Sequence, residues 1–276
     1  MTRETLMTTS SVATSLELRL FGPFEARVRG VPLPPLRTRK DAWLLALLVL
    51  HGGRPLDRAW LAGTLWPESE ETSARANLRK SLKSLRHALG DQADRIQAPT
   101  PRALRLALAG ADVDLLTFDA AVADAARGRA GAATLEERLE AAVALYRGPL
   151  LDGCHETWVL LERQWREEAY LDALEWLADR AGSRGEWGRA QRWLRRALAV
   201  HPLRESAHRS LMQVLACSGN HAAALQVYRD LRLRLHRELS VPPDRETTAL
   251  FDVIRVTAGE HAHCRRSPLC RRKDQG

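Results

Sequence analysis

The chain reads TSARANLRKSLKSLRHAL from Thr72 to Leu89, and its leucines recur at spacings of four, three and four residues. Such spacing places the leucines on one face of an α-helix, where they can pack into a core. The same stretch carries no acidic residue and five cations: Arg75, Arg79, Lys80, Lys83 and Arg86. Like charges three or four residues apart repel one another on a helix. We therefore expect a polyanion to meet this basic helix, and a nucleic-acid backbone is the first candidate.

The outward side of the basic helix combines small polar side chains with cations. A projection at about 100° per residue places five residues broadly opposite the leucines, with a sixth, Lys83, beside these five. The predicted DNA-binding residues of the helix are these six: Ser73, Asn77, Lys80, Lys83, Ser84 and His87. Phosphates bind cations, whereas base edges bind short hydrogen-bonding side chains, and an amide can pair with adenine. Three arginines lie nearer the buried edge and are expected to contact the DNA backbone or nearby acids: Arg75, Arg79 and Arg86. The alternative is an ordinary solvated helix face, against which the lack of balancing acids argues.

Hydrophobic periodicity predicts a small α+β domain around the basic helix. Alternating apolar residues indicate strands, and apolar residues at helical spacing after capping residues indicate helices. The predicted elements are strands 16–20 and 24–28, helices 39–51, 57–65 and 72–89, and a hairpin formed by 95–98 and 104–108. The order along the chain is therefore sheet, three helices and hairpin.

Four further cations lie at positions where they could contact phosphate. Arg37, Arg39 and Lys40 precede and open the first predicted helix, where free backbone N–H groups already favour an anion. Arg102 lies in or near the hairpin turn, from which it could enter a minor groove. Each of these residues could equally be an ordinary solvent-exposed charge.

A different composition begins at Asp112, with long segments rich in Ala, Leu, Arg and Glu at helical spacing. Within it, matching residues recur 34 positions apart: Gly185 and Gly219, Ala190 and Ala224, Leu194 and Tyr228, and Ala197 and Leu231. A 34-residue period with small residues at close-packing positions is typical of tetratricopeptide repeats. A stack of this kind needs at least three helical pairs, and the segments 115–127, 134–147 and 155–181 supply further helices.

The distribution of charge supports two domains of different character. Residues 1–111 hold 17 Lys or Arg against 10 Asp or Glu, whereas residues 112–256 hold 20 against 22. The positive charge therefore belongs to the first domain and the tail, as expected if the first domain contacts phosphates and the second contacts protein. The predicted organisation is a disordered N-terminus (1–15), a DNA-binding domain (16–111), an all-α domain (112–256) and a basic disordered tail (257–276).

The sequence predicts a cytoplasmic protein. Its four cysteines are too few and too scattered for a disulfide framework, so a reducing compartment is expected. Residues Met1 to Ser15 lack the apolar core of a signal peptide. The longest apolar run, Trp43 to Leu50, is eight residues long and cannot span a bilayer.

No sequence motif indicates catalysis, a cofactor or a metal. The chain lacks a P-loop, a dinucleotide-binding glycine pattern, HExxH and a nucleophile elbow, so we do not expect an enzyme. The tail offers side chains of the types that bind zinc: His261, His263, Cys264 and Cys270. Their spacing matches no zinc finger, and the surrounding arginines favour a basic tail. We therefore expect neither a metal site nor a cofactor.

Several motifs together resemble a known family of regulators. In the first half these are Trp43 to Leu48, Leu65-Trp66-Pro67 and Ala76 to Gly90, which resemble the OmpR-type winged helix that opens SARP-type bacterial activators. In the second half, Leu145 to Leu151, Glu162-Arg163, His201-Pro202, Tyr228 and Glu238 to Pro243 resemble the bacterial transcriptional activator domain. The resemblance covers about residues 16–256. Ser240-Val241 replace the usual glycine before the late proline pair.

The resemblance implies an α+β winged helix-turn-helix domain followed by an all-α tetratricopeptide-like domain, with helix predominating overall. It implies that the basic helix enters the major groove of double-stranded DNA while the hairpin touches the minor groove. Binding to direct repeats near a promoter, recruitment of RNA polymerase and a homodimer on DNA are also expected. The alternative is a tetratricopeptide-type adaptor that binds protein and has no DNA role.

Overall fold

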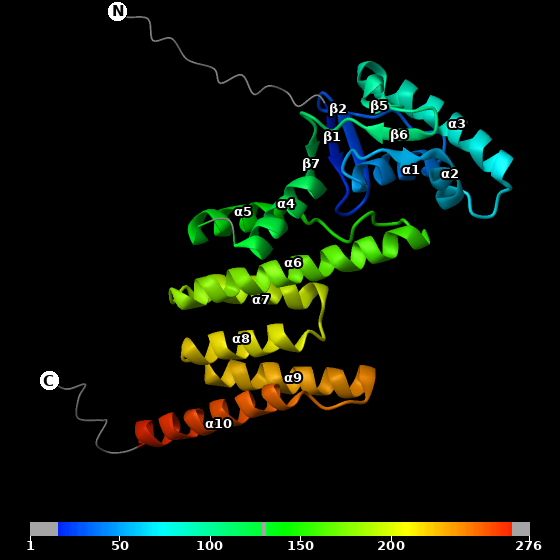
Figure 1. Cartoon of the computed structure of the whole chain (residues 1–276). Helices are drawn as coiled ribbons and strands as arrows, with labels where there is room; N and C mark the ends of the chain where they lie inside the picture. Colours follow the sequence, from blue (N-terminus) through cyan, green and yellow to red (C-terminus); the bar gives the residue numbers. More distant parts are fainter. Residues whose placement is uncertain (1–15, 129–130, 267–276) are drawn as a thin grey trace, which may run out of the picture. The chain divides into compact units, whose positions relative to one another are not determined.

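The computed structural model describes residues 16–128 and 131–266 (Figure 1). The chain divides into two compact units, of which the first ends at Glu167 and the second begins at Glu168. This division falls inside helix α6 (Thr157–Ser183). The predicted domain boundary at residue 112 therefore lies within the first unit. The predicted N-terminal disordered segment, 1–15, lies outside the described residues.

The first unit opens with a four-stranded sheet whose order is β3-β2-β1-β7. Its strands are β1 (Leu16–Arg19), β2 (Glu25–Val28), β3 (Val31–Pro32) and β7 (Asp112–Val113). Strand β1 pairs antiparallel with β2, Leu16 opposite Val28, and parallel with β7. Alternating residues of β1 are buried, which confirms the period-two prediction. The sequence did not predict β7, because two residues show no periodicity.

Three helices and a second sheet follow, in the predicted order of helices and hairpin. The helices are α1 (Arg39–Leu50), α2 (Arg58–Leu65) and α3 (Glu71–Leu89), and the 3₁₀ helix η1 (Gly90–Arg95) comes after them. The second sheet has the order β4-β6-β5, with β4 (Leu56–Asp57), β6 (Ala103–Leu106) and β5 (Ile96–Gln97). Helix α1 is buried from Trp43 through Val49, so it forms the centre of this part of the fold.

A buried carboxylate joins the sheet to the start of α4 (Asp114–Arg127), which precedes α5 (Ala132–Leu145). Asp114 accepts hydrogen bonds from the backbone N–H groups of Leu20 at 2.9 Å and Phe21 at 3.1 Å. Burial raises the pKa of Asp114, although these hydrogen bonds act in the opposite direction. The ring of Phe21 also lies 5.0 Å from the rings of Phe118 and Tyr146. Residues beyond 112 thus complete the core of the first unit.

The second unit continues α6 with α7 (Trp187–Val200), α8 (Glu205–Cys217), α9 (His221–Leu239) and α10 (Arg245–Arg266). The six non-glycine residues of the predicted repeat are all buried. Gly185 and Gly219 have φ values of 73° and 81° at the ends of α6 and α8. The hydrogen bonds from Glu186 N to Ala181 O and from Asn220 N to Leu215 O are both 2.9 Å long and occupy equivalent positions. The 34-residue repeat is therefore confirmed in packing and in backbone geometry.

The predicted disordered tail begins too early, because α10 continues to Arg266. Within α10, Thr247 in the first turn and Ile254 in the third turn are buried. Residues 267–276 lie outside the described part of the chain. Among the described residues, none of the helices combines the length and apolar character that a membrane span requires.

The repeat glycines give a test of this geometry. Gly219→Ala places a side chain at a φ of 81°, and we expect it to lower the free energy of unfolding by about 1–2 kcal/mol. The matched control is Gly188→Ala, in the exposed first turn of α7 with open space around the added Cβ. That change should raise the free energy of unfolding by about 0.5–1 kcal/mol, because alanine favours helix. Urea unfolding measures both, and equal effects would contradict the repeat geometry.

Candidate nucleic-acid interface

Helix α3 has one buried face and one exposed face. The predicted leucine stripe is confirmed: Leu78, Leu82, Leu85 and Leu89 are buried, together with Ala74 and Ser81. The opposite side exposes Ser73, Arg79, Lys80, Lys83 and His87. Gly90, with a φ of 56°, ends the helix. The exposed side of α3 is therefore cationic and polar, as the sequence predicts.

Asp41 holds α3 against the start of α1. Its fully buried carboxylate accepts hydrogen bonds from Ser81 Oγ at 2.5 Å, from Thr38 Oγ1 at 3.0 Å and from Thr38 N at 3.3 Å. Burial raises the pKa of Asp41, but hydrogen bonds from Ser81, Ser84 and Thr38, together with the charge of Arg37, outweigh burial and lower it. The carboxylate therefore stays ionised and connects the two helices.

The six predicted DNA-binding residues of α3 differ in their exposure. Ser73, Lys80, Lys83 and His87 are exposed, and Asn77 is half-buried on the same side of the helix. Ser84 is half-buried and lies near Asp41, whose pKa it helps to lower. Its place at the side of the helix that faces Asp41 could not be seen from the helical projection alone.

The arginines at the edge of α3 have different surroundings. The helix begins at Glu71, one residue before the predicted start, and Glu71 forms an ion pair with Arg75. Arg86 donates a hydrogen bond of 3.3 Å to the carbonyl of Ile96 in β5. Arg79 is exposed, and no ion pair joins it to another described residue. Of the three edge arginines, Arg79 is therefore the one whose charge is most available to an outside anion.

The cations around α1 are also partly engaged. Lys40 forms an ion pair of 2.7 Å with Glu156, and Arg37 lies 3.5 Å from Asp41. Arg39 is exposed at the first position of the helix, and Arg102 is exposed in the turn before β6. Arg39 and Arg102 are thus available to an outside anion, whereas Lys40 would have to leave Glu156.

Arg58, which the sequence pattern did not single out, lies beside these residues. It is the first residue of α2, and its backbone N–H donates to the carbonyl of Arg102 at 2.8 Å. With Arg75, Arg79 and Arg102 it lines a hollow of about 570 Å³. The sequence marks Arg58 only as the residue after the capping residue Asp57. Its place beside Arg102 depends on the hairpin, which the sequence around Arg58 does not show.

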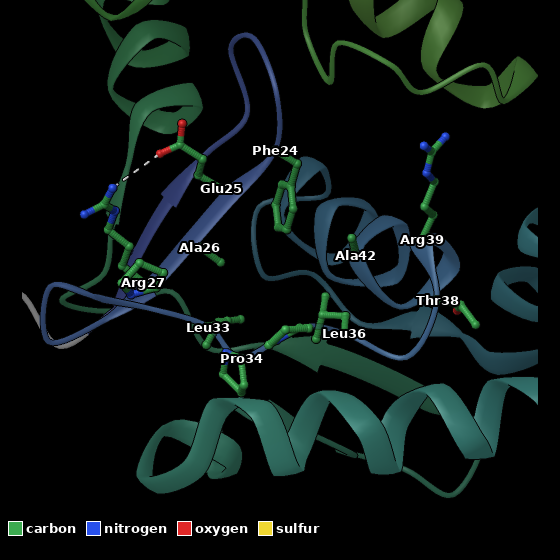
Figure 2. Close-up of a pocket in the computed structure, with 12 residues that line it drawn as sticks. Phe24, Glu25, Ala26, Arg27, Leu33, Pro34, Leu36, Thr38, Arg39 and Ala42 are labelled. Carbon is green, nitrogen blue, oxygen red and sulfur yellow. Dashed lines mark ion pairs between the residues drawn. The ribbon is translucent and has the colours of Figure 1, made fainter.

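A second hollow of about 510 Å³ lies between β2, the proline-rich segment after β3 and the start of α1 (Figure 2). Phe24, Leu33, Pro34 and Leu36 make its lining mainly apolar, and Figure 2 shows Arg39 extending away from these side chains. The lining contains no histidine or cysteine, and its one hydroxyl, that of Thr38, donates its hydrogen bond to Asp41.

No group of three metal-binding side chains occurs within the part of the chain that the structure describes. Of the tail residues considered as zinc ligands, His261, His263 and Cys264 fall in the last turns of α10, and Cys270 lies outside the described residues. Cys154 is buried, which raises its pKa and keeps the thiol protonated.

Comparison with known proteins identifies the family. A family model described as "Bacterial transcriptional activator domain" matches residues 113–255. The chain belongs to this family. Transcriptional regulatory protein EmbR of Mycobacterium tuberculosis is 29% identical over 89% of the chain and 64% of the relative. The regulatory protein AfsR of Streptomyces coelicolor is 32% identical over 83% of the chain and 23% of the relative.

The solved structures lead to the same family. The structure described as "Mycobacterium tuberculosis EmbR in complex with low affinity phosphopeptide" matches with a TM-score of 0.68 and 28% identity, over 88% of this chain and 65% of that one. The resemblance to SARP-type activators and the predicted fold class are thereby confirmed. Members of the bacterial transcriptional activator domain family and these relatives are transcriptional regulators rather than enzymes. The chain spans less than two thirds of EmbR.

Asp41 allows a test of how α3 is held. Asp41→Asn should lower the free energy of unfolding at pH 7 by about 1–3 kcal/mol, because it removes an ionised acceptor from three hydroxyl or backbone donors. Because the pKa of Asp41 is lowered in the folded state, its contribution is present above the unfolded pKa of about 3.9 and is lost as the pH falls through the folded value.

The measurement is urea unfolding of both proteins between pH 7 and pH 2. The difference between wild type and Asp41→Asn should shrink as the pH falls below about 4. The matched control is Asp94→Asn, at an exposed position of η1, which should change stability by less than about 0.5 kcal/mol. A difference for Asp41→Asn that stays constant with pH would contradict the role given to its charge.

Proposed function

We propose that this protein is a sequence-specific, double-stranded-DNA-binding transcriptional regulator whose helix α3 enters the major groove. The observation that carries the proposal is the exposed face of α3. Lys80, Lys83 and Arg79 lie on it without an ion pair to any described residue. The opposite face of the same helix is fixed in the core by its leucines and by Asp41. A rigid helix with uncompensated charge on one side suits the wide major groove.

The exposed residues fit different parts of the DNA. Lys80 and Lys83 would bind phosphates, because an ammonium group is a strong but undirected partner for an anion. Asn77 and Ser73 would contact base edges, since an amide can donate to and accept from adenine. His87, near the end of α3, would contact the flanking backbone.

The hairpin β5–β6 would act as the wing. Its turn carries Arg102, which is exposed and is the predicted residue for a minor-groove or backbone contact. The turn is tied to the first residue of α2 through the Arg58 N–H to Arg102 carbonyl bond of 2.8 Å. This bond connects the wing to the helices that precede α3.

The remaining parts of the proposal rest on the family. Binding to direct repeats near promoters, formation of a homodimer on DNA and recruitment of RNA polymerase are what the resemblance to SARP-type activators implies. The family description, "Bacterial transcriptional activator domain", supports an activating effect, and the descriptions of the relatives as regulators support a role in regulation. The helical repeats of the second unit are suited to protein partners, because stacked helical pairs present extended binding surfaces. Such a regulator works where bacterial DNA lies, in the cytoplasm.

Salt-dependent DNA binding tests the proposal. We expect Lys80→Ala with Lys83→Ala to weaken binding to every DNA sequence and to reduce the slope of log affinity against log salt by about two. The matched control is Arg192→Ala with Arg229→Ala, which removes the same charge from exposed positions of α7 and α9 and should leave the slope unchanged. Fluorescence anisotropy with labelled duplex DNA provides the measurement.

A salt-independent affinity, or a loss of only a few tenths of a kcal/mol in the Lys80 and Lys83 double variant, would overturn the DNA proposal. The second candidate is a tetratricopeptide-type adaptor that binds protein alone, favoured by the confirmed 34-residue repeat. It predicts equal, negligible effects of both double variants on DNA.

Asn77→Ala tests sequence reading separately from affinity. Footprinting on the DNA upstream of the protein's own gene supplies a target site. We expect Asn77→Ala to reduce the preference for that site over unrelated DNA by about 1–3 kcal/mol, because one base contact is lost. Non-specific affinity should remain nearly unchanged. An equal loss on both DNAs would show that Asn77 does not read bases.

A further inference from the structure

The hollow between α2, α3 and the turn before β6 gathers positive charge from three separate segments. Arg58 comes from α2, Arg75 and Arg79 from α3, and Arg102 from the turn, around a volume of about 570 Å³. Such a gathering repels itself in the absence of an anion. The hollow shares Arg79 with the exposed face of α3 and adds arginines from α2 and from the turn before β6.

The acids near the hollow are already engaged. The carboxylate of Asp57 accepts hydrogen bonds from the backbone N–H groups of Ala59 at 2.8 Å and Trp60 at 3.0 Å. Glu71 is paired with Arg75. Neither Arg58, Arg79 nor Arg102 has an ion pair with another described residue. The hollow thus keeps a net positive charge.

Arg58 is the arginine of this group that has a buried donor without a hydrogen-bond partner among the described residues, namely its Nε. Burial lowers the pKa of Arg58, and the charge of Arg86 lowers it further. A buried donor without an acceptor destabilises a protein unless a ligand supplies one. The backbone bond to Arg102 prevents the first residue of α2 from moving away.

We propose that this hollow seats one backbone phosphate of the bound DNA and that Arg58 is its anchoring residue. The inference rests on the DNA-binding function proposed above and adds a specific site to it. A phosphodiester offers the oxygen acceptors that the Nε–H and the guanidinium fork of Arg58 require. The same phosphate would bridge α2, α3 and the wing turn, and so fix the wing relative to α3.

The site has a consequence for the free protein. Without DNA, Arg58 keeps an unpaired buried donor and is repelled by the charge of Arg86. Removing the charge of Arg58 should therefore stabilise the free protein while weakening its DNA complex. A residue that merely supported the fold would have the opposite effect on stability.

The experiment compares the full chain with Arg58→Met and Arg58→Lys, and uses Arg192→Met on α7 as the matched control. We expect Arg58→Met to raise the melting temperature of the free protein and to weaken DNA binding at least fivefold, on specific and unrelated duplexes alike. The salt slope should fall by about one. Arg58→Lys keeps the charge but loses the fork, so its affinity should lie between those of wild type and Arg58→Met. Arg192→Met should change neither quantity.

Inorganic phosphate, compared with chloride at matched ionic strength, identifies the source of the anion. Phosphate that raises the melting temperature of wild type but not of Arg58→Met supports an anion seat. If wild type shows this response but does not bind DNA, the seat takes a free anion and the DNA assignment is overturned. If the Lys80 and Lys83 variant weakens DNA binding while Arg58→Met does not, the proposal for the hollow fails and the DNA-binding function stands. If Arg58→Met fails to fold, the predicted gain in stability is wrong. An Arg58→Lys variant that binds DNA as tightly as wild type would then contradict the proposed phosphate seat as well.

Discussion

The buried carboxylate of Asp41 is the interaction on which the winged-helix part of the structure depends. An ionised group without solvent is costly to bury, and here Thr38 and Ser81 supply the hydrogen bonds that offset this cost. Because Ser81 belongs to α3, the same bond that satisfies the charge also restrains the rotation of that helix about its axis. The leucine stripe supplies most of the packing, but apolar contacts alone are not directional. The direction in which Lys80 and Asn77 face follows from this combination.

A second buried carboxylate, Asp114, explains why the family boundary and the packing boundary differ. The family model begins at residue 113, whereas the compact unit continues to Glu167. Asp114 receives the backbone N–H groups of Leu20 and Phe21, and Phe21 packs on Phe118 and Tyr146. The first turns of the activator domain therefore complete the core of the winged-helix part. A fragment that ended at residue 111 would expose Phe21 and leave two backbone donors without their acceptor.

Much of this architecture could be predicted from the sequence, because its long elements have clear periods. The leucines of α3, the alternation of β1 and the 34-residue repeat each reflect a local pattern that tertiary packing preserves. Features that depend on distant partners could not be predicted. Segments brought together by the fold form the two-residue strands β4 and β7, the Ser81–Asp41 hydrogen bond and the Lys40–Glu156 pair. Arg58 belongs to the same class, since its importance appears only when the hairpin turn lies beside α2.

The two parts of the described chain differ in charge and in the kind of residue that they bury. The winged-helix part concentrates positive charge, and its buried carboxylates, Asp41 and Asp114, connect helices to neighbouring segments. The helical repeats bury small residues and place glycine where each turn requires a positive φ, which suits a scaffold for protein partners. Hydrogen–deuterium exchange of the full chain with and without duplex DNA tests the central claim most directly. We expect protection on DNA binding to concentrate in α3, the start of α2 and the β5–β6 turn. Protection confined to α7–α10, or none at all, would contradict this claim.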